Sequence, residues 1–125
     1  MILSPSRAAR VFAYPTPVDL RRGYDGLYGL VEQGLKQAPL SGDLFLFVNA
    51  TRKLCKVLLW DGTGLCIFQK RIDRGTFAKL WRDDDQVVRL TLSELALFIE
   101  GSTILDRRSL SPAPTRNVLV SDRGV

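Results

Sequence analysis

The feature that most constrains the fold is a set of three apolar segments separated by short polar loops. Residues 44–48 form an uninterrupted apolar run, and residues 54–60 and 65–71 follow after the loops 49–53 and 61–64. Runs of this length between turn-forming residues are typical of strands, and loops this short join antiparallel neighbours. The sequence therefore predicts an antiparallel meander.

Side chains in this meander alternate between the two faces of the sheet. In the register set by the second loop, Trp60 lies opposite Leu65 and Cys55 lies opposite Lys70. Both faces are then apolar at mid-strand, whereas a sheet with one face in water alternates apolar and polar residues. Either helices cover both faces, or one face meets a second copy or another protein. The residues predicted for such an interface are Leu58, Trp60 and Ile67.

The segment before the meander predicts one strand and one helix. Residues 9–14 have strand composition and stop at Pro15 and Pro17, which indicates a short edge strand. Asp19 offers a cap for a helix whose apolar residues recur at helical spacing through Lys36. Glycines spaced three apart in this helix favour a close approach to a neighbouring element. They are Gly23, Gly26 and Gly29.

After the meander, residues 87–90 would add a fourth strand. Thr91 and Glu94 match a capping box, which predicts a helix over residues 92–100 that ends at Gly101. The order of strand, helix, strands and helix is typical of an α+β protein. We therefore expect an α+β domain with an antiparallel meander sheet of about four strands and two main helices.

This domain is expected to span residues 1–108, because the remainder of the chain changes character. Residues 109–125 contain Pro112, Pro114 and several serines, and they show no hydrophobic periodicity. Such a composition predicts a flexible tail that orders only on a partner.

The chain contains no histidine, which removes most common catalytic and metal sites. Ser-His-Asp triads and histidine-based zinc sites are excluded, and the 2 cysteines are too few for a four-thiolate site. Residues 83–85 are three adjacent aspartates that fit a solvated loop better than a metal site, because metal ligands usually come from separate segments. We expect no enzyme activity, no catalytic residue, no metal and no cofactor. A carboxylate-held magnesium ion, as in a nuclease, is the remaining catalytic alternative.

The N-terminal residues and the apolar runs bear on location. Residues 1–10 lack the apolar core of a signal peptide, and no uncharged apolar run is long enough to span a bilayer. We expect a cytoplasmic protein with no membrane partner, in which Cys55 and Cys66 remain thiols. The predicted register also places these cysteines roughly 13 Å apart along the ladder, beyond disulfide reach.

The charge balance is basic, with 18 Lys and Arg against 13 Asp and Glu and a net charge of +5. Such a balance favours polyanionic partners such as DNA. The meander would gather six cations at one end of the sheet, where they either contact phosphates or protect a sheet edge from aggregation. These are Arg52, Lys53, Lys56, Lys70, Arg71 and Arg74, with Arg21 and Arg22 as outer members.

Four segments, in consistent order, resemble a known family. The sequence over residues 10–101 is similar to the TnpB accessory proteins, which the second open reading frame of bacterial insertion sequences of the sixty-six family encodes. After Gly101 the chain departs from the family pattern, because residues 102–108 lack the usual tryptophan and the tail is longer. The segments that carry the resemblance are residues 19–27, 56–68, 70–71 with 74–77, and 95–101.

The resemblance implies a role in transposition of a bacterial mobile element, beside a separate DDE-type transposase and a second small accessory protein. It brings no established catalytic residue. We therefore expect a non-enzymatic accessory protein that binds DNA, the transposase complex, or both. The alternative is a protein-only scaffold or dimerisation module that does not bind nucleic acid and uses the apolar sheet face.

Overall fold

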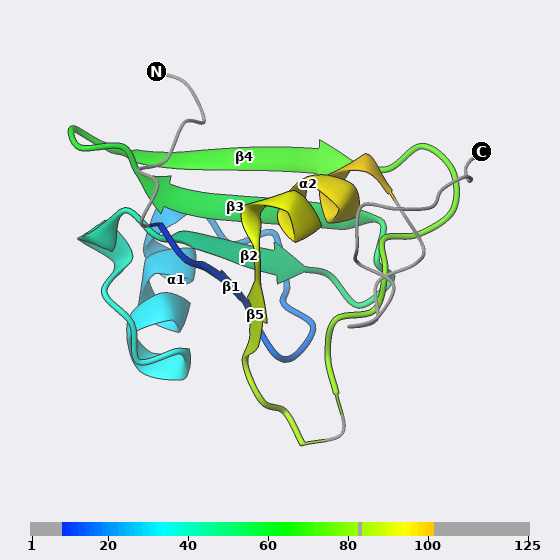
Figure 1. Ribbon diagram of the computed structural model, residues 1–125, viewed down its shortest axis with the longest axis horizontal. Helices are drawn as coiled ribbons and strands as arrows, with labels where there is room; N and C mark the ends of the chain where they lie inside the picture. The colour runs from blue at the N-terminus through cyan, green and yellow to red at the C-terminus, as the bar shows by residue number, and fades with distance from the viewer. Residues whose placement is uncertain (1–8, 83, 102–125) are drawn as a thin grey trace.

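The computed structural model describes residues 9–82 and 84–101, which form a five-stranded sheet with helices on both faces (Figure 1). The strands lie in the order β4-β3-β2-β1-β5. They are β1 (Val11–Ala13), β2 (Leu44–Val48), β3 (Leu54–Trp60), β4 (Leu65–Arg71) and β5 (Val88–Leu90). The helical elements are α1 (Tyr24–Gly29), the π-helical turn η1 (Leu30–Gly34), the short 3-10 helix η2 (Pro39–Ser41) and α2 (Leu92–Glu100).

The predicted meander is confirmed for β2, β3 and β4. β2 pairs antiparallel with β3, and β3 pairs antiparallel with β4. Trp60 lies opposite Leu65 and Cys55 opposite Lys70, as the loop length predicts. The α+β class is also correct, because the helices pack on a sheet whose strand pairs are mostly antiparallel.

The remaining strands correct the prediction of a purely antiparallel four-stranded meander. β1 is not an edge strand, because it pairs parallel with β2 on one side and antiparallel with β5 on the other. β5 therefore lies at the far edge of the sheet from β4. Parallel neighbours need a long crossover, which the segment containing α1 supplies. A strand of only 3 residues carries too little pattern to reveal its partners.

The first helix also differs from the prediction. Gly23, and not Asp19, occupies the N-cap, and it makes no side-chain capping bond. The Asp19 carboxylate instead accepts a hydrogen bond from the Arg21 backbone N–H at 3.0 Å. The α-helix ends at Gly29 and widens into η1, where the Leu35 N–H donates to the Leu30 carbonyl at 3.1 Å.

The expected close approach of this helix occurs at a different glycine. A Cβ atom at Gly23 or Gly29 would meet no neighbouring atom within 4 Å, and at Gly26 it would lie 3.0 Å from the Cβ atom of Arg22, which lies just before the same helix. At Gly34 a Cβ would collide with the Tyr14 side chain, which follows β1. Gly34 is thus the position in this helical segment where the tertiary structure requires a missing side chain.

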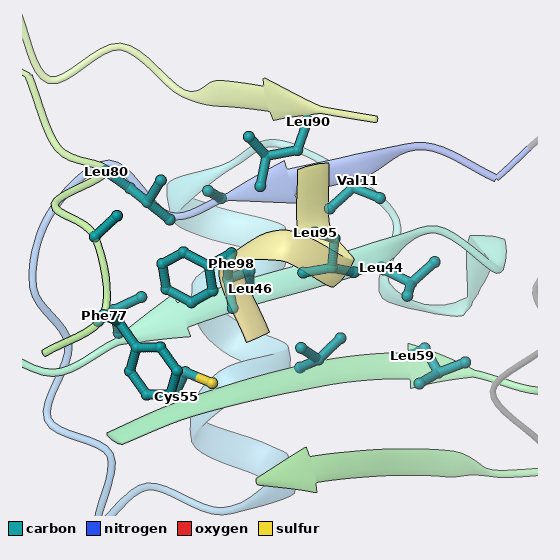
Figure 2. Packing of buried hydrophobic residues seen from close by; sticks show 14 residues of the cluster. Val11, Leu44, Leu46, Cys55, Leu59, Phe77, Leu80, Leu90, Leu95 and Phe98 are labelled. Atoms are coloured by element: carbon teal, nitrogen blue, oxygen red, sulfur yellow. The ribbon is translucent and has the colours of Figure 1, made fainter. Parts of the chain in front are cut away.

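Helices cover both faces of the sheet, which is the first of the two alternatives that the sequence left open. On one face, α2 and residues 72–81 pack on β2 and β3, and the rings of Phe77 and Phe98 stack at 5.0 Å (Figure 2). On the opposite face, α1 and η1 pack through Leu27 and Val31, both with no exposed surface. All five residues of β2 are consequently buried.

The second helix matches its prediction at both ends. The Thr91 hydroxyl accepts from the Glu94 N–H at 3.0 Å, and the Glu94 carboxylate accepts from the Thr91 N–H at 2.8 Å. Gly101 ends the helix with a left-handed φ of 94°. Within residues 9–82 and 84–101, no helix has the length and apolar character to cross a membrane. The predicted tail, residues 109–125, lies outside the described residues.

An ion pair between the exposed Arg10 and the buried Asp43 marks the point where β1 and β2 begin to pair. The Asp43 carboxylate, 5% exposed, accepts from the Arg10 backbone N–H at 2.9 Å and from its guanidinium at 2.8 Å. The Leu44 N–H donates to the Arg10 carbonyl at 2.9 Å. Burial alone would raise the pKa of Asp43, but the hydrogen bonds from Arg10 outweigh it and hold the pKa below its ordinary value.

We predict that Asp43→Asn lowers the free energy of unfolding by about 1–3 kcal/mol at neutral pH, because it removes charge-assisted hydrogen bonds at a buried site. A carboxyl group whose pKa is lowered by folding stabilises the protein above its unfolded-state pKa and loses this effect as the pH falls through the folded value. The difference between the two proteins should therefore shrink below about pH 4. Urea unfolding at pH 7 and at pH 3 measures it. The control is Asp73→Asn, whose side chain is 97% exposed and should change stability little.

The two cysteines share one face of the sheet but differ in environment. Cys55 is fully buried, and this burial raises its pKa to about 12. Cys66 on β4 is half-buried. Partial burial and the Asp61 carboxylate, 3.6 Å from the Cys66 sulfur, raise the pKa of Cys66. The register that separates the two thiols is the predicted one.

We predict that a maleimide labels Cys66 alone in the native protein and labels Cys55 only after unfolding, because reaction requires an accessible thiolate. Asp61→Asn should speed native labelling at pH 7, since it removes the negative charge that raises the pKa of Cys66. Mass spectrometry after timed quenching measures both rates. In Cys66→Ser the native reaction should disappear, and rapid native labelling of Cys55 would contradict the buried position of β3.

Candidate functional site

The loop between β2 and β3 forms the basic end of the sheet, and one asparagine organises it. The Asn49 side-chain oxygen accepts from the backbone N–H groups of Lys53 at 3.0 Å and Leu54 at 3.2 Å. Arg52 then adopts a left-handed φ of 59°. Asn49 is not among the predicted site residues, although asparagine directly after a strand is a common signal for a tight turn.

The chain leaving β4 returns to this loop, as the meander predicts. The Ile72 N–H donates to the Lys53 carbonyl at 2.9 Å, and the Phe77 N–H donates to the Arg52 carbonyl at 2.7 Å. Lys70 and Arg71 at the end of β4 lie opposite Cys55 and Leu54. Cations from separate segments are therefore gathered at one end of the sheet, which lies where β4 ends in Figure 1.

Four of the predicted cations also hold this end together. Each donates a hydrogen bond from its side chain to a backbone carbonyl in another segment, and a carbonyl carries no formal charge to neutralise the cation. The donors and acceptors are Arg52 to Phe77 at 3.1 Å, Lys53 to Gly75 at 2.6 Å, Lys56 to Arg22 at 2.8 Å and Lys70 to Ile99 at 2.7 Å.

The structure divides these cations between the two faces. Lys70 lies on the face covered by α2, where its ammonium group binds the carbonyl end of that helix, a position that favours positive charge. Lys56 and Arg71 lie on the other face, because alternate residues of a strand point the same way and these residues share the face of Leu54. Arg22 joins them there through the bond from Lys56.

Exposure separates these cations further. Lys56 is buried, with 8% of its surface exposed, so its role is in the structure of this end. Arg21 is exposed but forms an ion pair with Asp19 at 2.6 Å. The hydrogen bonds from the Arg21 side chain and backbone strongly lower the pKa of Asp19. Arg74 has a long contact of 3.8 Å with Asp73, and both side chains are almost fully exposed.

Arg22 and Arg71 are exposed, and neither side chain has an ion-pair partner within residues 9–82 and 84–101. The basic end therefore offers unpaired guanidinium groups beside cations that bind backbone carbonyls. Hydrogen-bond donors and positive charge of this kind suit an anionic ligand.

The predicted apolar interface is only partly accessible. Leu58 has no exposed surface and packs beneath α1, so it is a core residue and cannot contact a partner. Trp60 and Ile67 are half-buried, as is Leu65 between them. The turn η2 lies beside this end of β3 and exposes 47% of Leu40. An apolar surface thus remains near the β3–β4 hairpin, at the opposite end of the meander from the basic end.

The acidic motifs have local structural roles where the structure describes them. Asp61 accepts from the N–H groups of Thr63 and Gly64 and so closes the β3–β4 turn. Asp84 accepts from the Gln86 N–H at 3.0 Å, while Asp83 lies outside the described residues. Within the described ranges, no group of three acidic, cysteine or histidine side chains is placed to hold a metal ion.

Two curated proteins from Sinorhizobium fredii are similar to this chain along most of its length. The uncharacterized protein y4jC is 36% identical over 100 residues, which cover 80% of this chain and 85% of that protein. The uncharacterized protein y4hO is 33% identical over 101 residues, which cover 80% of this chain and 86% of that protein. No solved structure matches the chain.

The model of the family described as IS66 Orf2-like proteins matches residues 9–109. This range includes every strand and helix that the structure describes and all the cations of the basic end. It also agrees with the resemblance carried by the short segments of the sequence. The chain therefore belongs to the IS66 Orf2-like family, the TnpB accessory proteins of insertion-sequence transposition.

Proposed function

We propose that this protein assists transposition by binding DNA phosphates at the basic end of its sheet while it associates with the transposase. The observation that carries the proposal is the pair Arg22 and Arg71, two exposed guanidinium groups without ion-pair partners in the described part of the chain. Arg74 and Lys53 extend the surface, and the buried Lys56, bonded to the Arg22 carbonyl, adds positive charge on the sheet face that carries Arg71. Phosphate contacts of this kind supply most non-specific DNA affinity.

The helices argue for contacts to phosphates and against base readout. Sequence-specific readers commonly insert a helix that carries basic or amide side chains into the major groove. Neither α1 nor α2 contains a lysine or an arginine, and each packs an apolar side against the sheet. DNA would therefore approach the strand ends and loops, and affinity should depend little on base sequence.

The apolar surface near the hairpin is the proposed contact for the transposase. Trp60, Leu65 and Ile67 remain half-buried although helices cover most of the sheet. Large aromatic residues at the centre of such surfaces contribute strongly to binding between proteins. Because this surface and the basic end lie at opposite ends of the meander, one copy could hold DNA and transposase together.

We predict that the affinity of wild-type protein for duplex DNA falls steeply with salt and that Arg22→Gln with Arg71→Gln makes the dependence shallower. Each neutralised phosphate contributes a slope of about 0.9 in log affinity against log salt, so two lost contacts remove about 1.8. Fluorescence anisotropy with element-end and unrelated duplexes, at several salt concentrations, measures the slope. Both duplexes should bind with similar affinity.

The matched control removes the same charge from elsewhere. The double variant Lys36→Gln with Arg89→Gln removes two exposed cations, and Arg89 lies in β5 at the other edge of the sheet. It should leave the slope of log affinity against log salt nearly unchanged. If wild-type protein binds no DNA at low salt, or if both double variants behave alike, the basic end is a rim that protects the sheet edge. The protein-only scaffold then becomes the better reading.

We predict that Trp60→Ala weakens binding of the purified transposase at least tenfold while lowering stability only modestly, because Trp60 is half-buried. Leu58→Ala is the matched control, since this fully buried residue should cost about 2–5 kcal/mol of stability without a specific effect on binding. Thermal unfolding and surface plasmon resonance give the two quantities. A Trp60→Ala protein that loses stability but keeps full affinity would contradict the proposed surface.

A further inference from the structure

β4 is a seven-residue strand with a partner on one side only. Two hydrogen bonds at the ends of β4 show which of its residues are bonded to β3. They run from the Ile72 N–H to the Lys53 carbonyl and from the Asp61 N–H to the Gly64 carbonyl. Bonded pairs in an antiparallel ladder recur at every second residue, so even-numbered residues of β4 turn their backbone groups toward β3. Odd-numbered residues turn theirs outward. These are Leu65, Ile67, Gln69 and Arg71.

This outer edge has little protection along most of its length. The strand contains no proline, and within the described residues no element pairs with its outer side. The side chains that flank the edge are apolar on both faces and half-buried, with Cys66 and Phe68 on one face and Leu65 and Ile67 on the other. Charged residues occur only at its end, Lys70 and Arg71. An edge of this kind is a template for pairing with another strand.

The charge distribution along β4 favours a second copy in antiparallel orientation. A parallel neighbour of the same sequence would place both pairs of cations side by side. An antiparallel neighbour in full overlap places Leu65 opposite Arg71 and Cys66 opposite Lys70 of the other copy. The Asp61 carboxylate lies 3.6 Å from the Cys66 sulfur. Each Lys70, whose ammonium group also binds the Ile99 carbonyl of its own copy, would therefore lie on the same face as an acidic group of the other copy.

We propose that β4 pairs with β4 of a second copy about a two-fold axis at Phe68, so that the two sheets become continuous. The full overlap satisfies the outward backbone groups of all four odd-numbered residues. Phe68 then faces its own counterpart in a non-hydrogen-bonded pair, where side chains are closest. This contact uses backbone groups of the edge and needs neither DNA nor transposase, although it places Leu65, Ile67 and Arg71 beside the second copy. Because the dimer is measured without either partner, its failure is distinguishable from failure of the proposed function.

Gln69→Pro tests the backbone contact directly. Gln69 is exposed and its N–H points outward, so proline removes an edge donor without removing a bond to β3. Gln69→Thr keeps the N–H and is the matched control. Two lost hydrogen bonds per dimer should raise the dimer dissociation constant about thirtyfold, measured by sedimentation equilibrium, with an unchanged circular dichroism spectrum.

A second measurement tests the two-fold axis and does not depend on tolerance of proline. In a Cys66→Ser background, Phe68→Cys would bring two thiols together across a pair whose Cα atoms lie about 4.5 Å apart, within disulfide range. It should oxidise to a covalent dimer much faster than Gln69→Cys, whose copies are offset along the strand. A monomeric wild-type protein, a dimer that Gln69→Pro leaves intact, or equal cross-linking of both cysteine variants would overturn the proposal.

Discussion

Complete burial of β2 is the constraint on which the rest of the structure depends. All five of its residues are apolar and inaccessible, so the strand needs neighbours on both edges and cover on both faces. β1 and β3 supply the edges, α1 with η1 covers one face, and α2 with Phe77 covers the other. The crossover that carries α1 also makes β1 parallel to β2, and the Arg10–Asp43 pair fixes where that pairing starts.

Cations of the basic end stabilise the fold through hydrogen bonds to backbone carbonyls. The Lys53 side chain joins the loop after β2 to Gly75, which follows β4. Lys56 joins β3 to Arg22 before α1, and Lys70 joins β4 to the end of α2. Because these carbonyl acceptors carry no formal charge, they do not neutralise the positive charge of the lysines. Arg22 and Arg71 are exposed beside these hydrogen-bonded cations.

The chain places three different surfaces around one meander. Basic groups gather where β4 ends, half-buried apolar groups remain near the β3–β4 hairpin, and unpaired backbone groups line the outer edge of β4. Their separation follows from the topology, since a meander sends its loops to alternate ends and leaves its last strand with one free side. Leu65, Ile67 and Arg71 belong to β4 and therefore link its outer edge to the other two surfaces.

The sequence by itself determined the three-strand meander, its register and the capped helix α2, because loop lengths, continuous apolar runs and a capping box are local signals. It also determined that cations meet at one end. Only the tertiary structure decided the place of β1 and β5, since three-residue strands carry no information about their partners. It likewise decided that Leu58 is a core residue and that Lys56 is buried and bonded to the Arg22 carbonyl. Both outcomes depend on α1 and its neighbours covering this face, which requires contacts between residues distant in sequence. Periodicity shows which face a side chain occupies, whereas only packing shows what lies against that face.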